Sequence, residues 1–171
     1  FALPQLCHAV MVLATIPRGR IADLDTVKAE HAPGVLLVLT HRNAQALPDR
    51  GRAAFKPPAG RAMSLLQDDA VHYNRQPIAV VVADTFEHAV AAAALVDATY
   101  STQPPMLDFA REREREYKPK EVMGKPPDAR WGDPDGGERD AAVRVDATFT
   151  TPMQSHNPLE PHATIAHWEG D

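Results

Sequence analysis

The stretch YNRQPIAVVVADTFEHAVAAAALVDATY, residues 73–100, decides the fold of this chain. Residues 78–83 form an unbroken apolar run rich in valine, which is typical of a strand buried on both faces. Asp84 and Glu87 have the spacing of a capping box, so we expect a helix to begin there. One apolar stripe of that helix would face the sheet, made by Phe86, Ala89, Val90, Ala93 and Val96. The stretch therefore predicts a packed strand and helix.

The segments around this pair predict further strands and one more helix. The strands are expected at residues 8–16, 21–22, 35–40, 71–73 and 98–101. A short helix over residues 26–32 can be capped by Asp23 or Asp25, and Pro33-Gly34 would end it. The first part of the chain then has the order β-β-α-β, and β-α-β follows.

Composition excludes several classes of protein. The 171 residues carry a net charge of −5, which argues against a nucleic-acid-binding surface. No apolar run approaches the roughly 20 residues that span a bilayer, so we expect a soluble protein. The single cysteine, Cys7, excludes an internal disulfide, an iron–sulfur cluster and a multi-cysteine zinc site within the chain. We interpret Cys7 as a small packing residue.

The middle of the chain is interpreted as a connection between two domains. Residues 106–142 have no sustained apolar period and contain several prolines. Arginine and glutamate alternate over residues 111–116, which indicates a solvated segment with local charge pairing. Residues 143–150 and 162–168 then alternate as half-buried strands do.

Potential ligands and proton carriers crowd together between these two strands. Gln154, His156, Asn157, Glu160 and His162 fall within nine residues, and the prolines between them prevent a helix. Two histidines and a carboxylate are a legitimate ligand set for zinc or non-haem iron. The alternative is that these side chains brace a buried turn through hydrogen bonds to the backbone.

Two other positions are weaker candidates. Arg18-Gly19-Arg20 is expected to be a hairpin turn, and its two charges only weakly suggest an anion site. Gln76 lies at the entrance to a strand, where a side-chain amide normally satisfies loop backbone.

Two motifs carry a family resemblance. YNRQPIAVVVA at residues 73–83, with the alanine-rich helix after it, and QSHNPLEPH at residues 154–162 resemble the large molybdenum-binding subunit of the xanthine dehydrogenase and aldehyde oxidase family. The second motif is similar to the bacterial aldehyde oxidoreductase branch in particular. The order of elements before residue 40 also resembles that family's N-terminal hammerhead domain.

The resemblance implies an α/β fold in three parts. Residues 1–105 would form a hammerhead-type domain with a mixed sheet and two helices, and residues 106–142 an extended linker. Residues 143–171 would be the first strands of the molybdopterin-binding domain. Family enzymes hydroxylate aldehydes or N-heterocycles with oxygen from water, and electrons pass through iron–sulfur clusters to FAD or another acceptor. Iron–sulfur and FAD subunits or domains are thus the implied partners, and a molybdopterin-type molybdenum cofactor is implied for the complete protein.

The one functional residue that the resemblance transfers is Gln154, which matches the family glutamine that hydrogen-bonds an oxygen of the molybdenum centre. The family's catalytic glutamate and its pterin-binding loops would lie beyond Asp171, so we expect these residues alone to be inactive scaffold. Two alternatives stay open. One is a stand-alone metal-binding or hydrolytic protein that uses His156, Glu160 and His162, and the other is an interaction domain without chemistry.

Overall fold

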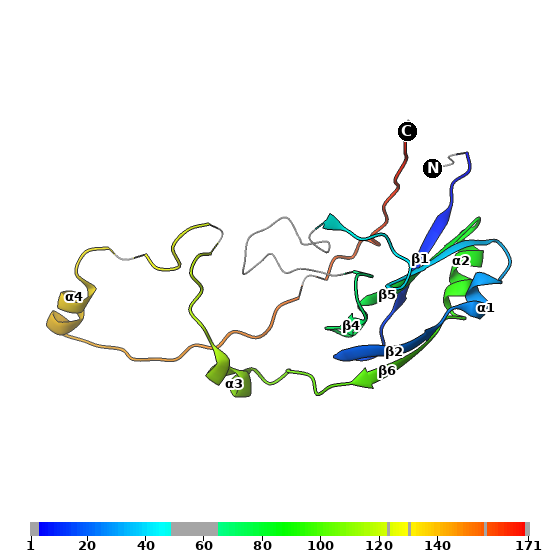
Figure 1. Cartoon of the computed structure of the whole chain (residues 1–171). Helices are drawn as coiled ribbons and strands as arrows, with labels where there is room; N and C mark the ends of the chain where they lie inside the picture. The colour runs from blue at the N-terminus through cyan, green and yellow to red at the C-terminus, as the bar shows by residue number, and fades with distance from the viewer. Residues whose placement is uncertain (1–3, 49–64, 123, 130, 156, 170–171) are drawn as a thin grey trace. The chain divides into compact units, whose positions relative to one another are not determined.

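The computed structural model describes residues 4–48, 65–122, 124–129, 131–155 and 157–169 (Figure 1). The contacts within the chain divide it into two compact units, Phe1–Ala129 and Arg130–Asp171. The six strands that the described residues form all lie in the first unit. None of the described helices is long and apolar enough to cross a membrane.

Strand β5 (Pro77–Ala83) is the centre of the first sheet, whose order is β1-β5-β3 (Figure 1). It pairs antiparallel with β1 (His8–Leu13) and with β3 (Val35–Thr40). Ile78 and Ala79 are 2% and 0% exposed. Because neighbouring residues of a strand point to opposite faces, both faces are covered here, as the valine-rich run predicts.

Strand β2 (Gly19–Asp25) is the centre of the second sheet, in the order β4-β2-β6. It pairs antiparallel with the two-residue strand β4 (Ala70–Val71) and with β6 (Asp97–Thr102). Gly19 faces Val71 on one side and Thr102 on the other. The start of β2 and the ends of β4 and β6 therefore meet at one end of this sheet.

Both connections that contain a helix pass from one sheet to the other. Helix α1 (Val27–Glu30) leads from β2 to β3, and helix α2 (Phe86–Ala93) leads from β5 to β6. Neither helix therefore joins two parallel strands of one sheet. Every strand pair in the two sheets is antiparallel, so the expectation of a mixed sheet is wrong.

Helix α2 begins one residue later than the sequence predicts. Its N-cap is Thr85, whose side-chain oxygen accepts a hydrogen bond from the backbone N–H of His88 at 3.2 Å. Asp84, the predicted cap, instead hydrogen-bonds the Nδ1 atom of the His88 ring at 2.6 Å. The Asp84 carboxylate, which would cap the helix in a capping box, is therefore hydrogen-bonded to the imidazole of His88 instead.

Helix α2 packs against β1 and β5, and α1 packs against β3 (Figure 1). The buried residues of α2 are Ala89 and Ala92. Phe86 and Val90, which the predicted stripe includes, are 55% and 44% exposed. The close contact with the sheet is thus made by alanines, whose small side chains let the helix backbone approach.

Two apolar clusters hold the first unit together. One joins the two sheets, and its buried members are Ala14, Ile21, Leu24, Val71, Ile78 and Ala79. The other joins the first sheet to the helices, and its buried members are Ala29, Val38, Val81 and Ala92. Val12 and Val96 pack against both clusters, so the two form a continuous core.

Beyond β6 the described residues form little regular structure. A short helix α3 (Phe109–Glu112) runs into the 3-10 turn η2 (Arg113–Arg115). The Arg115 Nη1 lies 3.0 Å from the Glu112 Oε2, which confirms local charge pairing in the alternating segment.

The second unit contains one helix, α4 (Pro134–Asp140), among its described residues. The Asp133 carboxylate caps it by accepting a hydrogen bond from the N–H of Gly136 at 3.0 Å. The strands predicted at residues 143–150 and 162–168 are not formed. Val143, Val145 and Phe149 are 79–89% exposed, so the described part of this unit offers these apolar side chains no sheet or core to pack against.

Candidate functional site

The segment singled out by its ligand-type side chains is extended and exposed. Residues 151–155 and 157–162 lie in neither a helix nor a strand, as the prolines at 152, 158 and 161 predict. The side chains of Gln154, Asn157, Glu160 and His162 are all exposed, so the interpretation of a buried turn is wrong. His156 lies outside the described residues.

The segment forms no preassembled metal centre within the part of the chain that the structure describes. No group of three or more histidine, cysteine, aspartate or glutamate side chains in the described ranges could hold a metal ion. The zinc or iron hypothesis also needs His156, and therefore stays a prediction. No described residue hydrogen-bonds the Gln154 amide, so its N–H groups are available to an acceptor from outside this segment.

Gln76 has the role that its position predicts. Its side chain is 6% exposed, its Nε2 donates to the carbonyl oxygen of Ala70 at 2.7 Å, and its Oε1 accepts from the N–H of His72 at 2.8 Å. The amide thereby satisfies the backbone between β4 and β5. Cys7 differs from its interpretation, because it is exposed and not packed in the core.

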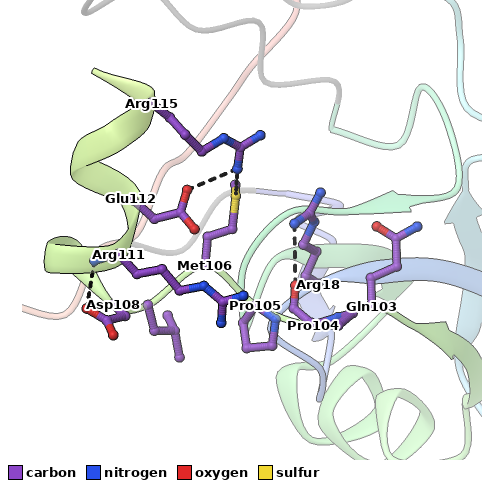
Figure 2. A pocket seen from close by; sticks show the side chains of 10 residues that line it. Arg18, Gln103, Pro104, Pro105, Met106, Asp108, Arg111, Glu112 and Arg115 are labelled. Atoms are coloured by element: carbon purple, nitrogen blue, oxygen red, sulfur yellow. Dashed lines mark hydrogen bonds and ion pairs between the residues drawn. The ribbon is translucent and has the colours of Figure 1, made fainter. Parts of the chain in front are cut away.

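A groove lies at the end of the second sheet where Gly19 meets its two neighbouring strands. One cavity, of about 350 Å³, is lined by residues 103–108 together with side chains of α3 and η2 (Figure 2). A second, of about 670 Å³, is lined by Pro17 and residues 72–74. The two cavities share Arg18, Pro105, Met106 and Leu107. We call this surface the Arg18 groove.

The position of the groove follows from the backbone at Gly19. Its φ is +153°, and a Cβ atom there would lie 2.2 Å from the carbonyl oxygen of Ser101. The close approach holds β2 beside the end of β6, where the N–H of Gln103 donates to the Arg18 carbonyl oxygen at 3.0 Å. The Arg18 Nη1 in turn donates to the carbonyl oxygen of Pro104 at 3.3 Å.

An ion pair on the same sheet fixes the start of β4. The Arg20 Nε donates to the Asp69 Oδ2 at 3.0 Å, and a second hydrogen bond joins the Nη2 to the other carboxylate oxygen. Hydrogen bonding from Arg20 lowers the pKa of Asp69 from its ordinary value. The backbone that leads into residues 72–74 is thereby attached to β2.

The sequence alone gives Arg18 only a weak indication of anion binding, and the alternation over residues 111–116 indicates only local charge pairing. The structure brings both segments to the Arg18 groove (Figure 2). The contact between Arg18 and Pro104 joins residues 86 positions apart. Local charge patterning carries no signal for such a contact.

One protein-family model matches the part of the chain that contains strands β1 to β6. A family model described as "Aldehyde oxidase and xanthine dehydrogenase, a/b hammerhead domain" matches residues 1–104. The chain belongs to the aldehyde oxidase and xanthine dehydrogenase family. The two antiparallel sheets and the two connecting helices α1 and α2 are therefore a hammerhead domain of this family.

Individual family members are similar over different lengths. The aldehyde oxidoreductase molybdenum-binding subunit PaoC of Escherichia coli K12 is 40% identical over 168 residues, which are 98% of this chain and 21% of that subunit. The carbon monoxide dehydrogenase large chain of Hydrogenophaga pseudoflava is 32% identical over 107 residues, 62% of this chain and 13% of that one. The chain thus spans about a fifth or less of these relatives.

A solved structure of a family member has the same fold over most of the chain. The copper- and molybdenum-containing carbon monoxide dehydrogenase in its carbon-monoxide-reduced state superposes with a TM-score of 0.62. It is 27% identical and covers 84% of this chain and 20% of that one.

Proposed function

We propose that these residues are part of the large subunit of a molybdenum hydroxylase, in which the hammerhead domain is scaffold. The observation that carries this proposal is the similarity to the molybdenum-binding subunit PaoC, which extends over 98% of this chain and so includes Gln154 and the segment around it. The activity would be the oxidative hydroxylation of an aldehyde or an N-heterocycle with oxygen from water. The 171 residues alone would be inactive.

The proposed division into domains is residues 1–105 as the hammerhead domain, residues 106–142 as linker and residues 143–171 as the beginning of the molybdopterin-binding domain. The exposed alternation of residues 143–149 supports the last part. Val143, Val145 and Phe149 lie two or four positions apart, as they would on one face of a strand. Such a strand needs a sheet to pair with, and further residues of the large subunit would supply it.

Gln154 fits one edge of a molybdenum cofactor site. Its amide is exposed, uncharged and without a hydrogen-bond partner among the described residues, so its N–H can donate to an oxygen of the cofactor. An amide does not titrate near neutral pH and keeps this donor at every working pH. When bound, the molybdenum cofactor supplies the two-electron oxidation chemistry.

Iron–sulfur and FAD subunits or domains are the proposed partners. The chain contains one cysteine and therefore cannot ligate an iron–sulfur cluster itself. Several relatives have names that describe a molybdenum-binding subunit or a large chain, and such names imply further chains.

Elemental analysis of the complete large subunit tests the proposal. We expect molybdenum and a pterin at close to one per subunit after purification and separation from its partners. The alternative is a metal site formed by His156, Glu160 and His162. It would be established if the separated subunit bound zinc or iron stoichiometrically and lost the metal when His156→Ala and His162→Ala were combined. Absence of molybdenum from an active preparation would equally contradict the proposal.

A further inference from the structure

We propose that the Arg18 groove binds an extended acidic and apolar segment of another polypeptide. The groove lies at the end of the β4-β2-β6 sheet, away from Gln154 in the sequence, and the proposal does not depend on the function proposed above. Its grounds are the charges, the exposed apolar side chains and the shape of the groove.

The charges of the groove favour an acidic ligand. Its two carboxylates already have partners, because Asp108 accepts a hydrogen bond from the N–H of Arg111 at 3.1 Å and Glu112 pairs with Arg115. The guanidinium of Arg111 has no hydrogen bond or ion pair with any described residue and extends towards Pro105 (Figure 2). Arg18 uses only its Nη1, on the Pro104 carbonyl. The groove therefore has guanidinium N–H groups without an acceptor among the described residues, on a chain whose net charge is −5.

The walls between these arginines favour apolar side chains. Met106 is 53% exposed and Leu107 is 77% exposed, and both line the two cavities. Tyr73, 43% exposed, lines the second cavity. The Met106 sulfur accepts a hydrogen bond from the Arg115 Nη1 at 3.1 Å, which holds this methionine beside the cations. Exposed apolar side chains of this kind lose contact with water when a partner covers them.

The shape of the groove distinguishes a polypeptide from a small anion. A carboxylate or phosphate ion would occupy only the cavity that Arg111 lines. The second cavity has the larger volume, about 670 Å³ against about 350 Å³, and no described side chain of α3 or η2 lines it. A ligand that fills both cavities must extend across the residues that they share, among them Arg18 and Leu107. An extended peptide with alternating acidic and apolar residues has this reach, with successive side chains directed to opposite sides.

Fluorescence anisotropy with the complete protein tests the proposal. The probe is a fluorescein-labelled, C-terminally amidated peptide of three Glu-Leu repeats. We expect saturable binding that Arg111→Gln weakens about tenfold or more, as for the loss of a charge-assisted hydrogen bond. Leu107→Ser should weaken it as well through a different contact. Arg113→Gln is the matched control, because Arg113 follows α3 directly, is exposed and lines neither cavity.

Three results would overturn the proposal. If a peptide of Gln-Leu repeats bound as tightly as the Glu-Leu peptide, the negative charge of the ligand would have no role in binding. Equal effects of Arg111→Gln and Arg113→Gln would indicate non-specific attraction to arginine. Displacement of the Glu-Leu peptide by citrate at the same concentration would make this a site for small anions. Circular dichroism spectra of the variants establish that lost binding is not lost folding.

Discussion

Asp84 and His88 lie one turn apart at the start of α2, with the Asp84 Oδ1 2.6 Å from the His88 Nδ1. This hydrogen bond is the main reason that the pKa of Asp84 lies below its ordinary value of 3.8. A carboxylate whose pKa is lower in the folded state stabilises the fold above its unfolded pKa. That contribution disappears as the pH falls through the folded-state pKa.

We therefore expect Asp84→Asn to lower the melting temperature at pH 7, and the difference from the unchanged protein to shrink as the pH falls below about 3.8. Thermal melts followed by circular dichroism between pH 7 and pH 2 measure this. Asp97→Asn is the control, because Asp97 is exposed and makes no side-chain hydrogen bond with a described residue. A difference that is independent of pH would rule out the ionised carboxylate as its cause.

Gly34 lies against the same pair of side chains, and a larger residue there should destabilise the fold. Its φ is +74°, and a Cβ atom would lie 2.2 Å from both the Asp84 Oδ1 and the His88 Nδ1. We expect Gly34→Ala to reduce the free energy of unfolding by roughly 1–3 kcal/mol. Gly124 has a similar φ of +78° and open space around it, so Gly124→Ala isolates the cost of the backbone conformation. Equal costs in urea denaturation would show that the contact contributes nothing.

How far the sequence predicts this fold depends on whether the signal is local. The valine-rich run predicts β5 and residues 35–40 coincide with β3, because uninterrupted apolar residues of strand length have few alternatives. Periodicity does not say which strands pair or in which direction, so it does not predict that every pair is antiparallel. The cap of α2 was misplaced because Asp84 and Thr85 can both cap a helix, and only the ring of His88 decides between them.

The same distinction applies to the candidate sites. The role of Gln76 follows from its place before a strand, and its partners Ala70 and His72 are within six residues. The Arg18 groove depends on strand register and on a contact over 86 residues, so no local pattern predicts it. The segment around Gln154 is visible only by its composition and its resemblance to a family. The structure shows this glutamine exposed and in neither a helix nor a strand.

Gln76 should be a strong stability determinant of the first unit. Gln76→Met keeps most of the volume of this buried side chain but leaves the Ala70 carbonyl and the His72 N–H without their partner in a partly buried place. We expect a loss of roughly 1–3 kcal/mol in the free energy of unfolding by urea denaturation. Gln103→Met is the matched control, because the Gln103 side chain is exposed and makes no hydrogen bond with a described residue. If Gln76→Met reduced the free energy of unfolding no more than Gln103→Met does, the hydrogen bonds of the Gln76 amide would not stabilise the fold.

Gln154 is the residue whose replacement distinguishes the proposed enzyme from an interaction domain. In the complete protein, we expect Gln154→Ala to lower turnover about tenfold to a thousandfold, as for the loss of one donor to a developing oxyanion. The melting temperature should not change, because this exposed side chain contacts no described core residue. Molybdenum content is measured in the same preparation, so that loss of the cofactor is separated from loss of the hydrogen bond. The neighbouring exposed residue Ser155 supplies the control, since Ser155→Ala also removes a polar group from the segment but no amide donor. Unchanged turnover in Gln154→Ala with full molybdenum content would exclude the proposed contact.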